Sequence, residues 1–299
     1  GEEIWRKVDW VTGKTQLCVE LCKKRRFFRR QDGKDEPKMA FTVHAVMPGV
    51  WHIVDCMGVC MTLLEGENAA MLVDTGYGIE DVADFMRHMT DLPLTVFLTH
   101  NHHDHAMGAR CFPETYMLEA DMADWRMFTD DKMRRRVLTQ AIGKNLPVDE
   151  KTFLAGEIPL PKVMKPGVID LGGLTAEIIE APGHTPGSAV VYVPERKLLL
   201  SGDDWNPCTW LFFPQALGLR EYRSNMRGIQ QLPFEKVLCP HREALYDRWM
   251  FDDFFNALTD GNLRAAEPVN IAPYEQVDTC QATLPHDQVL VFDWAKSGL

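Results

Sequence analysis

Short runs of apolar residues, separated by glycine, proline and acidic residues, recur along most of this chain. Runs of this length are typical of β-strands that bury one or both faces. The predicted strands are Thr42–Val46, Trp51–Val54, Cys60–Leu64, Ala70–Val73, Thr95–Thr99, Thr115–Leu118, Ala176–Ile179, Ala189–Val193, Lys197–Ser201 and Lys236–Cys239.

Helical spacing of apolar residues follows the first group of strands. It involves Ile79, Val82, Ala83, Met86 and Met89, which would share one face of a helix packed on the sheet. Two further helices are predicted over Glu221–Gln231 and Glu243–Leu258. Strands and helices therefore alternate, which indicates a mixed α/β fold.

The run from residue 99 to residue 108, Thr-His-Asn-His-His-Asp-His-Ala-Met-Gly, follows one of these strands. Four potential metal ligands fall within its six consecutive positions 100–105: His100, His102, Asp104 and His105. Imidazole nitrogens and carboxylate oxygens are ligands that zinc and neighbouring divalent metals favour. An exposed histidine-rich loop or a tag is the alternative, but a tag would be terminal and uniform. The string suits two adjacent metal ions better than one.

Other candidate ligands stand directly after predicted strands. His184 lies in a Gly-Pro turn, Asp203 follows Ser201-Gly202, and His241 follows Cys239-Pro240. Each of them alone is more often an ordinary loop residue. Together they place polar groups at the ends of several strands, where open α/β sheets carry their sites.

This ordered set resembles the metallo-β-lactamase-fold hydrolases. The matching motifs are Leu72-Val-Asp74-Thr-Gly76, His100 to His105, Gly183-His184, Gly202-Asp203 and Pro240-His241, within residues 42–250. The resemblance implies a four-layer αββα sandwich. It implies His100, His102 and His184 on one metal, Asp104, His105 and His241 on a second, and Asp203 bridging both. One departure is Cys239-Pro240-His241-Arg242, where relatives often have a glycine beside the last histidine.

Two ions held in this way would be most consistent with Zn²⁺, with iron or manganese as alternatives. Such a pair lowers the pKa of bound water towards about 7 and stabilises the leaving oxygen. The resemblance thus implies a dinuclear metal hydrolase whose nucleophile is a metal-bridging hydroxide, with Asp104 as the catalytic residue that orients it. Asp74 is either an outer carboxylate that fixes a ligand imidazole or a simple turn residue.

The sequence narrows the reaction only in part. His102 stands where the flavodiiron oxidoreductases carry Glu, which disfavours a redox role. The interval from Asp203 to His241 is too short for the inserted domain of the RNA-processing members, which disfavours that activity. We expect hydrolysis of an ester, thioester or lactone with an apolar portion. A phosphodiesterase of a small molecule, or a binding or regulatory module that keeps the metals without turnover, are the alternatives.

An aromatic segment, Trp205 to Pro214, follows Asp203 directly. Pockets are mainly apolar with a few placed polar groups. We predict that Trp205 and Trp210 face the substrate and that Phe212 or Phe213 faces the core. The segment Trp210–Phe213 facing inward is the alternative.

Three regions contain none of the motifs that carry the resemblance. Residues 1–40 are predicted to be an N-terminal arm. Its basic and aromatic run Lys23–Arg30 is of a type that binds nucleic acid or anionic lipid, but because it is one short run in an acidic chain we prefer an oligomer-forming or surface-packing arm. Residues 41–299 are predicted to form the catalytic domain. Within it, residues 119–168 are an insertion that acts as a lid or as a plain helical crossover, and residues 259–299 are a C-terminal extension.

Composition limits the partners. The net charge of the 299-residue chain is −11, which disfavours nucleic acid because phosphate binding depends on lysine and arginine. Its eight cysteines are irregularly spaced, which favours reduced thiols. No run approaches the ~20 apolar residues of a membrane span, and no signal-peptide pattern is visible. We therefore expect a cytoplasmic enzyme with a small-molecule substrate and no membrane association, and leave a homo-oligomer open.

Overall fold

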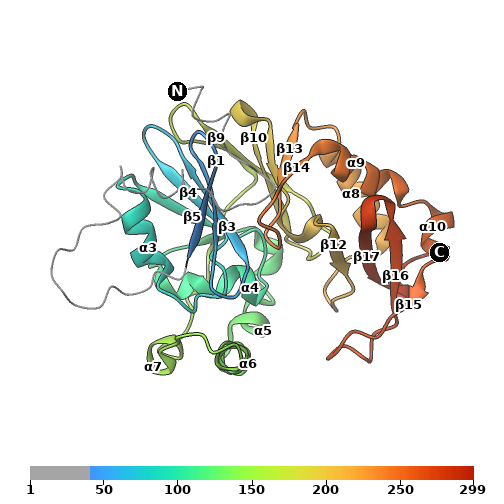
Figure 1. Ribbon diagram of the computed structural model, residues 1–299, viewed down its shortest axis with the longest axis horizontal. Coiled ribbons are helices and arrows are strands. Elements are labelled where there is room, and N and C mark those ends of the chain that lie inside the picture. Colours follow the sequence, from blue (N-terminus) through green and yellow to red (C-terminus); the bar gives the residue numbers. More distant parts are fainter. Residues whose placement is uncertain (1–40) are drawn as a thin grey trace.

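The computed structural model describes residues 41–299, so the predicted N-terminal arm lies outside the described residues. Two sheets form the centre (Figure 1). The first is seven-stranded, in the order β1 (Thr42–Met47), β2 (Val50–Val54), β3 (Cys60–Glu65), β4 (Ala70–Val73), β5 (Leu94–Phe97), β6 (Tyr116–Met117) and β7 (Lys162–Val163). The second is six-stranded, in the order β14 (Leu245–Asp247), β13 (Lys236–Leu238), β11 (Leu198–Leu200), β10 (Ala189–Val193), β9 (Thr175–Glu180) and β8 (Gly167–Asp170).

The two sheets pack face to face. One cluster of buried side chains joins Val73 and Phe97 of the first sheet to Val191 and Leu200 of the second. The outer face of the first sheet is covered by α3 (Val82–Met89), whose Val82 and Met86 pack with it. On the outer face of the second sheet lie α8 (Leu219–Ile229) and α9 (Arg248–Ala257). This is the expected αββα order, and the prediction of the fold is confirmed.

A third sheet was not predicted. It contains β12 (Cys208–Leu211), β17 (Gln288–Asp293), β16 (Thr279–Leu284) and β15 (Glu267–Pro268), in that order. Most of it comes from the C-terminal extension, which also contains α10 (Asp260–Arg264). Figure 1 shows it beside α8 and α9, and side chains such as Cys280 and Leu290 enter the same core cluster.

The long helix predicted over Glu243–Leu258 is wrong in its first part. Residues Leu245–Asp247 are the strand β14, which pairs antiparallel with β13, and α9 begins only at Arg248. Pairing with the free edge of β13 satisfies backbone groups that a helix start would have left exposed. The helix predicted from Ile79 begins at Val82, where the side chain of Asp81 caps it by accepting from Asp84 N.

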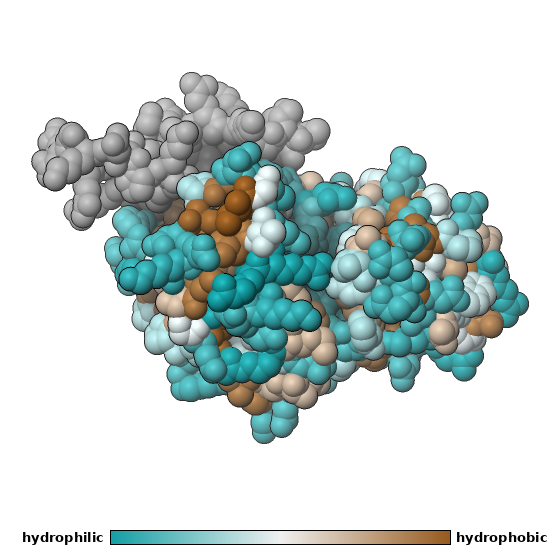
Figure 2. All heavy atoms as spheres, turned by 90° about the horizontal axis from the view of Figure 1, so that it is seen from below, coloured by the Kyte–Doolittle hydropathy of each residue, from teal (hydrophilic) through white to brown (hydrophobic). Residues whose placement is uncertain are grey.

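The insertion is helical and packs against the histidine-rich loop. It contains α5 (Trp125–Thr129), α6 (Asp131–Gly143) and α7 (Glu150–Phe153). Trp125 and Val137 share a buried cluster with Ala106 and Met107, which lie in α4 (His103–Ala106) and the turn η1 (Met107–Cys111). Seen from the side of these helices, the surface is largely hydrophilic with limited apolar patches (Figure 2). None of the helices in the described part is long and apolar enough to cross a membrane.

The strand directions explain why the site lies at one end of the sandwich. β4 and β5 are parallel, so Asp74 and His100 leave the first sheet at the same edge. In the second sheet β11 is parallel to β13, and both β9 and β11 are antiparallel to β10. The ends of β9, β11 and β13 therefore also coincide, which brings His184, Asp203 and His241 together.

Candidate metal centre

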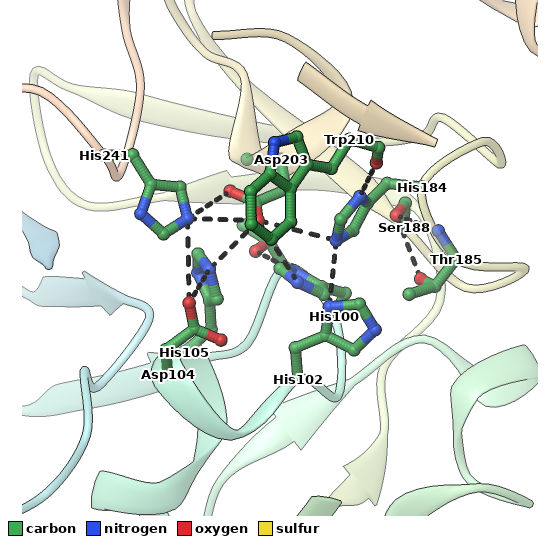
Figure 3. Close-up of polar contacts among 12 residues, drawn as sticks. His100, His102, Asp104, His105, His184, Thr185, Ser188, Asp203, Trp210 and His241 are labelled. Atoms are coloured by element: carbon green, nitrogen blue, oxygen red, sulfur yellow. Dashed lines mark hydrogen bonds and ion pairs between the residues drawn. The ribbon is translucent and has the colours of Figure 1, made fainter. Parts of the chain in front are cut away.

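The side chains of the motif residues converge at one end of the sandwich (Figure 3). Three groups of potential ligands have their donor atoms within 4.8 Å of one another. These groups are His100 with His102 and His184, His100 with His105 and Asp203, and Asp104 with His105 and His241. The sequence predicted all of these residues, and the fold brings all of them together.

Asp203 stands between the groups. Its Oδ2 atom lies 3.5 Å from His184 Nε2 and 3.4 Å from His105 Nε2. Its Oδ1 atom lies 3.1 Å from His241 Nε2. On the other side, His184 Nε2 lies 2.9 Å from His102 Nδ1. Ligands around a zinc ion, each about 2.0–2.2 Å from it, are themselves separated by about 3.3 Å, and these distances fit.

Some of these atoms lack any other partner. His100 Nε2 and His105 Nε2 are buried and make no hydrogen bond within residues 41–299. A buried polar atom without a partner costs about 1–3 kcal/mol. The cost is removed if the lone pairs coordinate cations, so the donor set fits a pair of metal ions.

The imidazole nitrogens that point away from the ligand cluster are hydrogen-bonded to other groups. Asp74 Oδ2 lies 3.0 Å from His105 Nδ1, and Asp74 Oδ1 accepts a hydrogen bond from Thr99 N at 2.8 Å. His184 Nδ1 donates to the backbone oxygen of Trp210 at 2.6 Å. Each of these contacts fixes the proton on the outer nitrogen and leaves the inner nitrogen free as a ligand. Asp74 therefore makes the imidazole contact predicted for an outer carboxylate.

Unusual backbone conformations aim the loops. Asp74 has a φ of 65°, in the left-handed region that aspartate tolerates better than most residues. Gly202 has a φ of 52°, and an added Cβ would lie 3.1 Å from the oxygen of Ala189. Glycine at this point lets the chain turn sharply out of β11 and direct Asp203 inwards.

Comparisons with known proteins agree with this geometry. Residues 54–241 match the family model described as the metallo-beta-lactamase superfamily. The chain belongs to this superfamily. A curated relative, the acyl-coenzyme A thioesterase MBLAC2 from Gallus gallus, is 26% identical over 202 residues, which cover 60% of this chain and 70% of the relative.

Solved structures show the same superfamily fold. The metallo-beta-lactamase from Pontibacter korlensis matches with a TM-score of 0.53 and 17% identity, over 74% of this chain and 99% of that one. A metallo-beta-lactamase family protein from Thermus thermophilus matches with a TM-score of 0.51 and 19% identity, over 74% and 82% of the two chains. The predicted resemblance is confirmed, and the protein is a hydrolase of the metallo-beta-lactamase superfamily.

Burial and ion pairing set the charges of the side chains in this site. Burial lowers the pKa of His102 and of His100 well below the ordinary value, so both rings are neutral and offer a lone pair. Burial raises the pKa of Asp203, but the facing rings of His241 and His105 outweigh it and hold that pKa well below its usual range. Burial also raises the pKa of Asp104, and nearby histidines outweigh this to lower it to about 2.

Two buried carboxylates that hold the loops were missed from the sequence. Asp121, in the insertion, accepts from Asn101 N at 3.2 Å, from Thr185 Oγ1 at 2.7 Å and from Gly187 N at 2.6 Å. It thus ties the histidine-rich loop to the turn that carries His184. Asp204 accepts from His184 N at 2.9 Å. Its place beside Asp203 was an available signal, whereas Asp121 belongs to no motif.

The prediction that Trp205 faces the substrate is wrong. Its side chain is fully buried (0% exposed), with its ring centroid 5.4 Å from that of Tyr246 and 5.6 Å from that of Phe251. It packs in the core between the second sheet and α9. Phe212 is also fully buried, as the prediction allowed.

Other aromatic residues lie beside the ligands instead. The ring centroid of Phe213 lies 4.8 Å from that of His102 and 5.3 Å from that of His184. The ring centroid of Phe128 in α5 lies 4.4 Å from that of His102. Trp210 keeps 38% of its surface exposed, and Figure 3 shows its indole ring in front of the site. Aromatic contact with the site therefore comes from the insertion and from Phe213.

Proposed function

We propose that the protein is a dinuclear metal-dependent hydrolase of carboxylic thioesters and related esters or lactones with an apolar acyl group. The observation that carries this proposal is the arrangement of two groups of ligand side chains on either side of Asp203. The thioesterase activity in the name of the Gallus gallus relative supports the choice of a thioester.

In this proposal His100, His102 and His184 would hold one ion, and Asp104, His105 and His241 would hold the other, with Asp203 placed between the two groups. Nitrogen and oxygen donors in these numbers suit Zn²⁺ best, with iron or manganese as alternatives. When bound, the two ions would make water acidic enough to ionise near neutral pH and would polarise the carbonyl group of the substrate.

The protein side chains would orient the attacking water. Asp104 Oδ2 lies 3.6 Å from His105 Nε2 and 3.7 Å from His241 Nε2, at the edge of the ligand cluster. Because its pKa is held low, it stays ionised and accepts a hydrogen bond from the attacking water, which fixes the direction of attack. A thiolate has a conjugate-acid pKa of about 8.5 and leaves without a protonated side chain beside it. Hydrolysis of a thioester at this site therefore needs no general acid to protonate the leaving group, whereas hydrolysis of an amide or an alkyl ester does.

The apolar part of the substrate would lie against Phe213, Phe128 and Trp210. Phe213 contacts His102 and His184, Phe128 contacts His102, and the indole ring of Trp210 lies in front of the site, so an acyl chain whose carbonyl reaches the ligands would pass over them. Each methylene buried there contributes about 0.8 kcal/mol, or roughly fourfold in binding.

The test is a panel of substrates with the metal-loaded enzyme: short and long acyl thioesters, the matching oxygen esters, and an aryl phosphodiester. We expect turnover of thioesters, with lower KM for the longer chain. Trp210→Ala should raise KM for the long chain and leave the short one unchanged. Trp249→Ala is the matched control, since Trp249 is similarly exposed (49%) and contacts His286 rather than the ligands. Phosphodiester turnover without thioester turnover would refute the proposal.

A further inference from the structure

The outer nitrogen of His102 faces the side chain of Gln215. His102 Nδ1 is 2.9 Å from His184 Nε2, so this nitrogen points towards the ligand group. The opposite nitrogen, His102 Nε2, lies 2.7 Å from the amide nitrogen of Gln215. If Nδ1 binds a cation, Nε2 must carry the proton and needs an acceptor.

Gln215 can supply that acceptor. Its amide oxygen is buried and makes no hydrogen bond within the described residues. The two ends of an amide group have nearly the same shape, so a half-turn places the oxygen where the nitrogen stands. His102 Nε2–H then donates to Gln215 Oε1, just as His184 Nδ1 donates to the oxygen of Trp210 and His105 Nδ1 to Asp74.

Gln215 is itself fixed by the C-terminal extension. It lies in a turn closed by a hydrogen bond from Ala216 N to Phe213 O, 2.9 Å long. The ammonium group of Lys296 donates to three carbonyl oxygens of this turn: Pro214 O at 2.6 Å, Ala216 O at 3.1 Å and Phe213 O at 3.4 Å. An ammonium group has three protons, so this lysine is fully engaged by the turn.

We propose that Lys296 and Gln215 are positioning residues that form a brace between the C-terminal extension and the metal ligand His102. The brace fixes the tautomer and ring orientation of His102 and keeps Phe213 against the same ring. The third sheet, with the segment that follows it, is then part of the construction of the site. This inference rests on the proposed metal site.

The brace predicts a change in the binding of one metal ion. The full chain is stripped of metal and titrated with Zn²⁺ against a chromophoric chelator, which resolves two binding steps. Loss of an outer partner of a ligand histidine weakens metal binding about 10–100-fold. We expect this loss for Gln215→Leu in one step only. Lys296→Met should weaken the same step by less, because Gln215 remains but its turn is looser.

Conservative and remote variants separate positioning from general damage. Gln215→Glu keeps an acceptor oxygen for His102 Nε2–H and should retain close to wild-type affinity. Gln231→Leu changes an exposed glutamine at the end of α8, and Lys197→Met removes an exposed ion pair with Glu235, so both should bind zinc as the wild type does. The unfolding temperature of each metal-free variant is measured alongside.

The proposal is overturned if Gln215→Leu binds both zinc ions as tightly as the wild type, or if Gln215→Glu is as weak as Gln215→Leu. An unchanged Lys296→Met would remove Lys296 from the brace. Failure of the wild type to bind zinc, iron or manganese would overturn the proposed function together with the brace. Wild-type binding of two ions with unaffected variants would overturn the brace alone.

Discussion

The contact between Asp74 and His105 allows a sharp prediction for Asp74→Asn. The carboxylate accepts from Thr99 N at Oδ1, from His105 Nδ1 at Oδ2, and from the rotatable Thr99 hydroxyl, which lies within reach of both oxygens. Asparagine has a single acceptor oxygen, which the backbone N–H of Thr99 will take because that group cannot change its role. The new amide nitrogen then faces His105 Nδ1, donor against donor. Asparagine tolerates the left-handed backbone at this position, so the exchange adds little strain.

The expected loss follows from the histidine tautomer. Facing a donor, His105 relocates its proton from Nδ1 to Nε2, the atom that lies 3.6 Å from Asp104 and 3.4 Å from Asp203. The protonated nitrogen has no lone pair for a metal. We expect metal affinity at this position to fall about 10–100-fold, which corresponds to about 1.4–2.7 kcal/mol.

Zinc titration of the metal-free protein measures this loss, and activity should fall in parallel at limiting zinc. Asp55→Asn is the control. Asp55 is also buried and accepts backbone N–H groups from Met57, Val59 and Tyr77, but it contacts no ligand histidine. The reasoning is refuted if Asp74→Asn binds both zinc ions normally, or if Asp55→Asn loses zinc to the same extent.

Three further predictions concern the core, the motif register and pH. Trp205→Ala should lower the free energy of unfolding by about 3–5 kcal/mol in urea titrations, and a small loss combined with a raised KM would restore Trp205 to the pocket. His103→Ala should keep both metals by elemental analysis while His102→Ala loses one; equal losses would mean that the ligand register is displaced. Burial lowers the pKa of His52 from 6.5 to about 4. Between these pH values the unfolded chain binds a proton that the folded protein does not, so the free energy of unfolding decreases by up to about 3 kcal/mol as the pH falls. Metal-free His52→Asn should lack this part of the pH dependence, and identical profiles for the two proteins would contradict it.

Much of the central sandwich could be predicted because its signals are local. Apolar runs such as Ala70–Val73 and Ala189–Val193 are buried throughout in the structure, and such strands need no knowledge of their neighbours to be recognised. The same holds for the candidate ligand residues. They stand directly after strands, and once β9, β11 and β13 run in one direction, their following loops meet at one edge.

The outer parts depend on contacts between distant segments. Residues Leu245–Asp247 have a helical neighbour in sequence, yet the unpaired edge of β13 makes them a strand. β12 is short, and it becomes part of a sheet only because the distant segment Gln288–Asp293 pairs with it in parallel. No local pattern shows such a pairing, so the third sheet was not predicted.

The sequence by itself determined most strands of the two main sheets, the candidate metal-binding residues and the superfamily. Only the tertiary structure decided where the aromatic residues after Asp203 point. In β12 alternate side chains face opposite ways, so Thr209 and Leu211 are buried while Trp210 is exposed. Trp205 lies before that strand, and the rings of Tyr246 and Phe251 enclose it in the core. A run of apolar residues shows that side chains will be buried, but the partners that bury them come from elsewhere in the chain.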